Sequence, residues 1–238
     1  MLAGEAVLAI VPARGGSKGL PGKNVRLLHD KPLLAWTLQA AQACPLLDRT
    51  ILSSDDEEIM AVARRFGCAV PFVRPGHLAN DTASSMEVIL HALDSLPEHY
   101  PWVVLLQPTS PLRRAEDISA CLEMCQREGA PACVTVTPTK SPSWCYFLDG
   151  DQRMVPVLGQ DNTRVGRQQL PSAYALNGAV YVARSDWLRE RRTFVTGETR
   201  AHLMPAERSV DIDTLFDFQW AEWLLRGGGL ACRPESAR

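Results

Sequence analysis

A loop rich in glycine and basic residues is the first part of the sequence that could carry chemistry. It reads VPARGGSKGLPGKN over residues 11–24 and follows a short apolar stretch. Its three cations, Arg14, Lys18 and Lys23, lie within ten residues. Glycine lets the backbone approach an anion closely, so that backbone N–H groups can surround it. This composition predicts a site for a polyphosphate.

Two common phosphate-binding loops do not match this segment. A Walker loop requires GxxxxGK[ST], but Ser17 and Asn24 stand where it needs glycine and a serine or threonine. A dinucleotide fingerprint requires GxGxxG, whereas Gly15 and Gly16 are adjacent and Pro21 interrupts the run. A hydride-transferring oxidoreductase is therefore a weak alternative. A surface turn without a ligand is also disfavoured, because clustered cations repel one another.

Asp211 and Asp213 flank Ile212 and form a candidate metal site. If Val210–Ile212 is a short strand, residues i and i+2 face the same way, so both carboxylates lie on one side while Ile212 enters the core. Two carboxylates, phosphate oxygens and water make a common magnesium site. The alternative, in which Asp213 only caps a helix that starts near Leu215, stays open here.

Several other polar residues have two interpretations each on sequence grounds. Ser85 could bind an acceptor at a helix start or serve in capping, and Gln107 could bind hydroxyls or only occupy a proline-bounded turn. Arg167 could pair with a carboxylate or phosphate, or lie on the surface. Asn177 and Gly178 could contact a substrate or simply form a turn before a strand.

The elements that must position these residues alternate between strand and helix. Apolar runs predict strands at Ala6–Val11, Thr50–Leu52, Val70–Val73, Trp102–Leu106 and Cys133–Val136. Helical periodicity separates them, with caps expected at Asp55 or Asp56 and at Thr82 or Ser84, and a helix over Glu116–Glu128 that ends at Gly129. This alternation predicts βαβ units with right-handed crossovers and a mainly parallel sheet.

The pattern weakens after Thr137. Residues 138–175 are rich in turn formers, with aromatic and valine residues that suggest twisted antiparallel hairpins. Further on, we expect a strand at Ala179–Ala183 and a closing helix at Leu215–Leu225. The expectation is a single domain over residues 1–238, a Rossmann-like three-layer α/β/α fold, with residues 138–205 as a β-rich insertion.

Composition narrows the classes of partner. The 238 residues carry 25 Lys and Arg against 27 Asp and Glu, a net charge of -2. Nucleic-acid and membrane-surface binding both need a basic face, so neither is expected, and no apolar run reaches transmembrane length. The seven cysteines contain no CxxC pair and predict reduced thiols rather than a zinc or disulfide framework. We expect a cytoplasmic protein.

Six segments, in this order, resemble those of the acylneuraminate cytidylyltransferases, the CMP-sialic acid synthetases. They are ARGGSKGLPGKN, RPGHLANDTASS, LLQPTSPLR, RQQLP, NGAVYVAR and SVDIDTLFD. The sister family that activates Kdo carries a different nucleotide loop. The resemblance implies transfer of CMP from CTP to the anomeric hydroxyl of a nine-carbon 2-keto sugar acid, with release of pyrophosphate. Two alternatives remain: legionaminate, pseudaminate or Kdn as the sugar, and a non-catalytic nucleotide-binding protein of the same fold.

The resemblance also implies roles for individual residues. The nucleotide-binding residues are Arg14, Ser17, Lys23, Asn24, Arg74 and Ser85. The sugar-binding residues are Gln107, Arg167, Asn177 and Gly178, and Arg14, Lys23 and Arg167 are catalytic. Asp211 and Asp213 would hold Mg²⁺, with Mn²⁺ as an alternative. Many relatives are homodimers, which implies that residues 138–205 and the stretch around Trp187–Phe194 serve dimerisation. For the apolar residues of that stretch, a place in the core fits equally well.

One segment departs from the family pattern. Some members carry a substrate-contacting lysine in the segment that corresponds to Pro142–Phe147, which reads PSWCYF here. Either Lys140 takes that role or Trp144 reshapes the pocket. The identity of the nine-carbon acid is therefore left open by the sequence.

Overall fold

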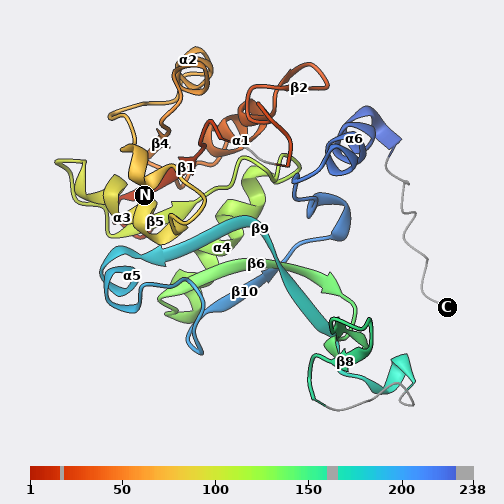
Figure 1. Ribbon diagram of the computed structural model, residues 1–238. Helices are drawn as coiled ribbons and strands as arrows, with labels where there is room; N and C mark the ends of the chain where they lie inside the picture. The colour runs from red at the N-terminus through yellow and green to blue at the C-terminus, as the bar shows by residue number, and fades with distance from the viewer. Residues whose placement is uncertain (17–18, 160–165, 229–238) are drawn as a thin grey trace.

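A six-stranded sheet forms the centre of the protein (Figure 1). The computed structural model describes residues 1–16, 19–159 and 166–228, and only the backbone at residues 167 and 228. The strand order is β10 (Arg200–Leu203), β6 (Ala132–Thr139), β9 (Ala173–Arg184), β5 (Trp102–Leu105), β1 (Val7–Pro12) and β4 (Arg49–Ser53). Only β9 runs antiparallel to its neighbours, β5 and β6. The predicted mainly parallel sheet is confirmed.

Helices cover both faces of this sheet because its strands are apolar on both sides. Val7, Ala9 and Val11 of β1 pack into one core with helices α1 (Leu33–Gln42), α2 (Glu57–Arg65) and α4 (Ala115–Glu128). The alternate residues Leu8 and Ile10 pack into a second core with α3 (Ser85–Asp94) and α5 (Ser185–Arg191). Successive side chains of a strand point to opposite faces, which produces the three-layer α/β/α arrangement.

A third, smaller core holds Asp211–Asp213, hereafter the acidic segment, against the glycine-rich loop. Leu20 of the loop and Ile212 pack with Phe218 of α6 (Leu215–Trp223). The expected strand at Val210–Ile212 is not formed: the segment has no strand pairing, and Ile212 N–H donates to the Thr109 carbonyl at 2.9 Å. Ile212 is nevertheless buried as predicted, with Asp211 and Asp213 on the surface.

Helix ends follow the predicted signals. Asp56 caps α2 by accepting from the Ile59 N–H, and Ser84 caps α3 in a reciprocal capping box with Glu87. Gly129 ends α4 with a φ of 62°, a left-handed conformation that glycine adopts without strain. The closing helix α6 stops at Trp223 and continues as a π-helical turn, η5 (Leu224–Gly228).

Small elements connect the main ones. Two short hairpins pair β2 (Leu27–Leu28) with β3 (Lys31–Pro32) and β7 (Tyr146–Leu148) with β8 (Met154–Pro156). Single 3₁₀ turns are η1 (Gly76–Leu78), η2 (Pro142–Trp144), η3 (Arg167–Gln169) and η4 (Ala206–Arg208). The β7/β8 hairpin projects beyond the carboxyl end of β6 (Figure 1). Residues 138–205 therefore divide between this projecting arm and strands β9 and β10 of the main sheet.

Of the other predicted strands, one does not form and one starts earlier than expected. Val70–Val73 forms no strand, and only Ala69 makes an isolated parallel bridge, to Ile51. The strand predicted at Ala179–Ala183 begins six residues earlier, at Ala173, so Asn177 and Gly178 lie inside β9 rather than in a turn before it. They form a bulge, because residues 177–180 of β9 all lie opposite Thr135 of β6.

Most cysteines of the described residues lie in the core. The six cysteines in the described residues are free thiols, and all except Cys145 are buried. Within the same residues, no helix is long and apolar enough to cross a membrane.

Candidate active site

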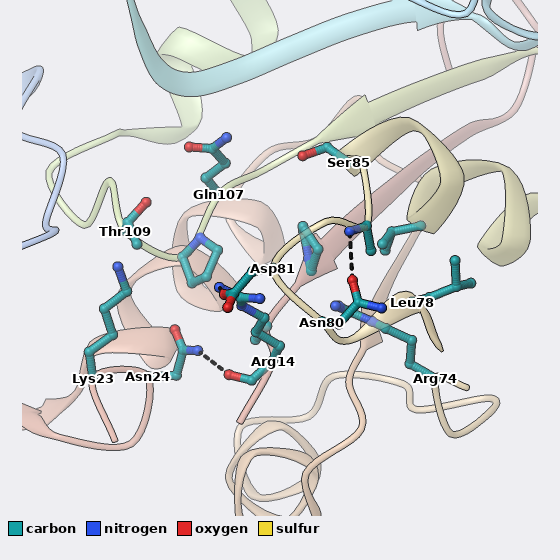
Figure 2. A pocket seen from close by; sticks show the side chains of 15 residues that line it. Arg14, Lys23, Asn24, Arg74, Leu78, Asn80, Asp81, Ser85, Gln107 and Thr109 are labelled. Atoms are coloured by element: carbon teal, nitrogen blue, oxygen red, sulfur yellow. Dashed lines mark hydrogen bonds and ion pairs between the residues drawn. The ribbon is translucent and has the colours of Figure 1, made fainter. Parts of the chain in front are cut away.

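A pocket of about 290 Å³ opens at the carboxyl ends of β1 and β5, between the glycine-rich loop and the start of α3 (Figure 2). Ligands of open α/β sheets bind at this edge. The structure brings six of the predicted site residues to its wall: Arg14, Lys23, Asn24, Arg74, Ser85 and Gln107. They come from four separate segments of the chain, which the parallel sheet gathers at one place.

The glycine-rich loop is held by its own residues and by neighbouring carboxylates. The Asn24 amide, which is buried, donates to the Arg14 carbonyl at 3.2 Å. The Arg14 guanidinium pairs with Asp81 at 2.7 Å, and Gly15 N–H donates to Asp55 at 3.2 Å. A guanidinium and a backbone N–H are the kinds of group that bind phosphate oxygens in a polyphosphate site. In the protein without ligand, these two groups of the loop are paired with the carboxylates of Asp81 and Asp55 instead.

Lys23 ties the loop to the acidic segment. Its ammonium donates to the Ile212 carbonyl at 2.8 Å and to the Asp213 carboxylate at 3.0 Å. Gly19 also packs against the Asp213 carbonyl so closely that a Cβ at this position would clash with it. Thr214, not Asp213, caps α6, which rules out the capping alternative for Asp213.

Arg74 supplies a buried cation at the end of β4. Its guanidinium donates to the Ser53 hydroxyl at 3.1 Å and to the Ser53 carbonyl. The backbone N–H of Arg74 donates to the Ser54 carbonyl at 2.7 Å. Burial lowers the pKa of Arg74 to about 10, so the side chain still carries its charge at neutral pH.

The start of α3 faces the same pocket. Ser84 satisfies the helix end, since its hydroxyl accepts from the Glu87 N–H at 3.2 Å. Ser85, the first residue of the helix, is left to line the pocket. Asn80 shapes the preceding turn by accepting from the Ala83 N–H at 2.8 Å (Figure 2). A helix start with exposed N–H groups favours an acceptor on the ligand.

The bulge in β9 brings Gly178 against Gln107 and Asp211. Gly178 has a φ of 75°, and a Cβ there would lie 2.6 Å from Gln107 Oε1 and 3.4 Å from Asp211 Oδ2. Only glycine allows both this conformation and this approach. The residues predicted for the sugar and for the metal therefore meet at one point beside the pocket.

The Asp211 carboxyl group is partly desolvated and lies near another acid. Its surface is partly open, but the surrounding protein desolvates the carboxyl group and raises its pKa, and the nearby Asp213 raises it further. The side chains of Thr109 and Lys23 act in the opposite direction. Carboxylates that disfavour each other's charge suit a shared divalent cation.

The donor set fits Mg²⁺ only together with a substrate. Across residues 1–16, 19–159 and 166–228, no group of three or more His, Cys, Asp or Glu side chains could hold a metal ion. Asp211 and Asp213 would provide two oxygen ligands, so phosphate oxygens and water must supply the others.

Comparison with known proteins decides the family. Residues 8–148 match the cytidylyltransferase family. The chain is also 36% identical to the CMP-N,N'-diacetyllegionaminic acid synthase of Legionella pneumophila, over 92% of this chain and 96% of that protein. The chain belongs to the cytidylyltransferase family.

Other relatives show how far the likeness extends. An N-acylneuraminate cytidylyltransferase of Escherichia coli is 36% identical over 90% of this chain, although the match covers only 51% of that protein. A pseudaminic acid cytidylyltransferase of Campylobacter jejuni is 32% identical over 92% of this chain and 96% of that protein. The resemblance seen in the sequence motifs is confirmed.

Solved structures support the fold. A CMP-2-keto-3-deoxy-manno-octonic acid synthetase solved with CTP matches with a TM-score of 0.71 at 16% identity, covering 94% of this chain and all of that chain. A 4-diphosphocytidyl-2C-methyl-D-erythritol synthase from Anaerococcus prevotii matches with a TM-score of 0.66 at 15% identity, covering 94% and 98%. This cytidylyltransferase therefore shares its fold with both of these enzymes.

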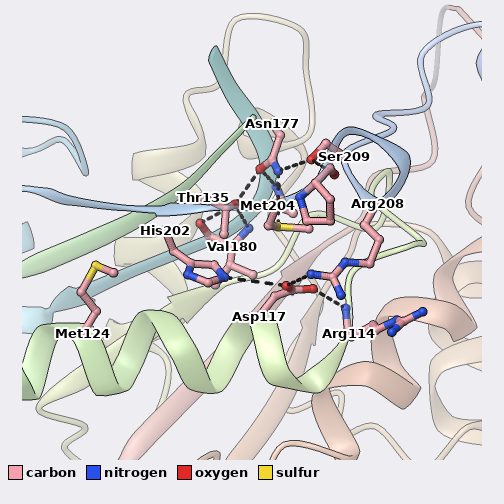
Figure 3. Close-up of polar contacts among 12 residues, drawn as sticks. Arg114, Asp117, Met124, Thr135, Asn177, Val180, His202, Met204, Arg208 and Ser209 are labelled. Carbon is pink, nitrogen blue, oxygen red and sulfur yellow. Dashed lines mark hydrogen bonds and ion pairs between the residues drawn. The ribbon is translucent and has the colours of Figure 1, made fainter. Parts of the chain in front are cut away.

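Three predicted residues of the cytidylyltransferase remain: one has a side chain that points elsewhere, and the side chains of the other two lie outside the described part of the chain. The Asn177 side chain is buried, accepts from the Thr135 hydroxyl at 2.6 Å and donates to Ser209 at 2.9 Å, so it points into the polar network of Figure 3. Ser17 lies outside the described residues, and Arg167 is described only by its backbone in η3. The roles predicted for Ser17 and Arg167 stay predictions.

The pocket also contains residues that the sequence interpretation missed. Asp81 and Asn80 lie within RPGHLANDTASS, and Thr109 lies within LLQPTSPLR. Their motifs were recognised, but an acid beside a phosphate loop has no obvious use until its pairing with Arg14 is seen.

Proposed function

We propose that this cytidylyltransferase transfers CMP from CTP to the anomeric hydroxyl of a nine-carbon 2-keto sugar acid of the N-acylneuraminate type. The observation that carries the proposal is the shared edge of the sheet at which a cation-rich pocket adjoins the cluster of Gln107, Gly178 and Asp211. Two substrates can meet there, one anionic and one rich in hydroxyl groups.

The nucleotide half of the site would position the α-phosphate. Arg14, Lys23 and Asn24 lie where they can hold the triphosphate, with Arg74 and Ser85 on the opposite wall. The hydroxyl oxygen of the sugar attacks phosphorus, the bond to the bridging oxygen breaks, and pyrophosphate leaves with the electron pair. The hydroxyl proton passes to solvent. Arg14 and Lys23 would stabilise the charge that develops on phosphate oxygens.

Triphosphate binding would replace acidic partners that these groups hold in the protein alone. Arg14 exchanges Asp81 for phosphate, and Lys23 can leave the Asp213 carboxylate. That exchange would free Asp213 to act with Asp211 as a ligand of Mg²⁺ or Mn²⁺. When bound, such an ion supplies positive charge to the phosphate oxygens and to the attacking hydroxyl.

The sugar would bind on the β9 side of the pocket. Gln107 lies beside the bulge glycine, where its amide can bond hydroxyl groups, and the Arg167 guanidinium is the predicted partner of the sugar carboxylate. The relatives carry the names of N-acylneuraminic, legionaminic and pseudaminic acid enzymes. All three are nonulosonic acids, which supports this class of acceptor.

The chain would form a homodimer. The arm carries exposed apolar side chains, among them Phe147 at 63% and Leu148 at 67% exposure, and Tyr174 and Leu176 of β9 are also exposed. Exposed apolar side chains gathered on one arm favour association. Leu188 and Phe194 from the stretch around Trp187–Phe194 are instead buried in the core, so the proposed dimer contact is the arm itself.

The test is pyrophosphate release with each nucleoside triphosphate and a panel of acids. N-acetylneuraminate, N,N'-diacetyllegionaminate, pseudaminate, Kdn and Kdo are tested in separate reactions. We expect release only with CTP and only with a nine-carbon acid. CTP binding without release of pyrophosphate in any of these reactions would support the non-catalytic alternative. Equal pyrophosphate release with other nucleoside triphosphates would contradict the proposal.

A further inference from the structure

Arg113 lies directly behind the edge of the pocket assigned to the sugar. It follows β5 in the turn that leads to α4, and only 3% of its surface is exposed. The pocket wall does not include it, so it cannot act on a substrate directly. Any effect on the reaction must pass through the residues that it holds.

The guanidinium joins two segments that are far apart in the chain. Its Nε donates to the Ala179 carbonyl at 2.8 Å, and its Nη2 donates to the Gln107 carbonyl. Gln107 follows β5, and Ala179 follows the bulge glycine of β9. Arg113 thus fixes the backbone on both sides of the narrow contact between Gln107 and Gly178.

The contact between Gln107 and Gly178 leaves little room for either segment to move. Gln107 Oε1 would lie only 2.6 Å from a Cβ at Gly178, so a small shift of either segment changes the direction of the Gln107 amide. The bulge itself is a weak point of the sheet, because residues 177–180 face Thr135 without regular ladder pairing. A rigid fork with fixed donor directions is suited to bridging two such carbonyls.

The charge of Arg113 is costly for a purely structural role. In the described part of the chain it forms no ion pair with a carboxylate, and its Nη1 has no hydrogen-bond partner. Burial lowers the pKa of Arg113 to about 9, so the side chain is still cationic at neutral pH. An unpaired buried cation destabilises a fold relative to an apolar side chain of similar size.

We infer that Arg113 is a positioning residue that sets the orientation of Gln107 against the β9 bulge and thereby the affinity for the sugar. The inference rests on the proposed function, since it takes Gln107 as the sugar-binding amide.

The test compares Arg113→Met and Arg113→Lys with wild type. CTP affinity is measured by calorimetry without sugar, and kcat and the sugar KM are measured at saturating CTP. Because misplacing a binding group by about 1 Å can cost ~10²-fold, we expect Arg113→Met to raise the sugar KM by at least about tenfold. CTP affinity should stay within about twofold. Lysine should rescue only part of the loss, because one ammonium lacks the fork.

Two controls separate positioning from general destabilisation. Leu122→Ala removes a fully buried side chain of α4 and should lower the melting temperature while the sugar KM stays at the wild-type value. In the Gln107→Ala background, adding Arg113→Lys should raise the sugar KM little further, since both changes remove the same contact. Additive effects in this cycle, or an unchanged KM in both Arg113 variants, would overturn the inference.

A structural readout keeps the inference separate from the proposed function. The side-chain amide signal of Gln107, in protein labelled with ¹⁵N-glutamine, should shift or broaden in Arg113→Lys and remain in place in Leu122→Ala. If the wild-type protein forms no CMP-sugar, the proposed function fails while this signal still tests the positioning. If Arg113→Met does not fold, Arg113→Lys carries the same comparison, and an unmoved signal in it would contradict the inference.

Discussion

At the scale of single residues, Arg14 has the clearest assignment. Its guanidinium lies at the pocket wall and is paired with Asp81, so its position is fixed before a phosphate arrives. Removing one such donor from a site that excludes water typically costs ~10²–10³ in rate. We expect Arg14→Ala to lose this amount in kcat, with little change in melting temperature. The matched control is Arg64→Ala, which removes an exposed ion pair on α2 and should leave kcat unchanged.

The acidic pair gives a second prediction. Asp211→Asn and Asp213→Asn should each lose most of kcat, because asparagine keeps the shape but not the charge that holds a divalent ion. The raised pKa of Asp211 shows that the fold disfavours its ionised form, so Asp211→Asn should also melt no lower than wild type. Kinetics at limiting Mg²⁺ and thermal melts measure both effects. Near wild-type rates in limiting Mg²⁺ would show that the metal assignment is wrong.

Residue types in the sequence were enough to predict much of the pocket wall, but not the residues that lie behind it. Arg14, Lys23 and Gln107 could be selected because cations, glycine and a strand-end amide have recognisable chemistry. Asn177 could not be placed, because the bulge turns its side chain to Thr135 rather than to the pocket. Arg113 ends the recognised segment LLQPTSPLR, but it could not be given a role, because its partners are backbone carbonyls, which leave no pattern in the sequence.

At the scale of elements, the bulge of β9 is the most sensitive feature. Gly178→Ala would place a Cβ 2.6 Å from Gln107 Oε1 at a φ of 75°. Strain at such a position costs about 1–3 kcal/mol, and the displaced amide should also raise the sugar KM. Gly197→Ala is the control, because a Cβ there meets nothing within 4 Å. Unfolding titrations and sugar kinetics of both variants test this, and equal behaviour of the two would count against the bulge as part of the site.

The network of Figure 3 secures the acidic segment to the sheet. Asp117 of α4 accepts from Arg208 at 2.7 Å and from the Arg114 N–H at 2.9 Å, and it is almost fully buried. Arg208 ends η4, three residues before Asp211. Burial alone raises the pKa of Asp117, but the hydrogen bonds from His202 and Arg114 and the charge of Arg208 outweigh it and lower the pKa below its ordinary 3.8.

This pKa shift fixes the sign of a pH dependence. A lowered folded pKa means that the unfolded chain binds the proton more readily, so the stabilisation is complete above about pH 5 and is lost as pH falls below the ordinary value of 3.8. Asp117→Asn should therefore lose about 3 kcal/mol at pH 7, the usual cost of breaking a buried pair. The difference from wild type should shrink toward pH 3 in denaturant titrations, and a difference independent of pH would contradict this assignment.

Strand prediction worked where apolar runs were continuous. β1, β4 and β5 were found because buried parallel strands are apolar on both faces. β10 was missed because Arg200–Leu203 is largely exposed at the sheet edge. The β7/β8 hairpin agrees with the antiparallel hairpins predicted in this part of the chain, but its strand bounds could not be given because each strand has only three residues, too few for a period. The antiparallel direction of β9 has no sequence signal, since pairing partners far apart in the chain decide it.

At the scale of the whole molecule, the alternation of strands and helices was enough to predict three layers. It could not show that β9 enters between β5 and β6, or that the arm leaves the sheet between β6 and β9. Both depend on contacts between distant segments. The position of the site followed more easily, because the carboxyl edge of a parallel sheet is fixed by topology.

The arm gives a prediction about assembly. Phe147→Asp together with Leu148→Asp would place two charges on the exposed apolar surface of β7. We expect wild type to sediment as a dimer and this variant as a monomer with unchanged melting of the core. The control is a double charge substitution on α2, Glu57→Lys with Arg64→Glu, which reverses an exposed pair away from the arm. A wild-type monomer at micromolar concentration would contradict the proposed dimer.

The central claim is that the anomeric hydroxyl of a nine-carbon acid attacks the α-phosphate of CTP. The most direct measurement is mass spectrometry of the products formed from CTP and an acid labelled with ¹⁸O at its C2 hydroxyl. The account predicts a CMP-sugar that retains the label in the bridging oxygen and pyrophosphate that contains none. A CMP-sugar without the label, in a reaction faster than exchange of the hydroxyl with water, or no CMP-sugar with any nine-carbon acid, would contradict it.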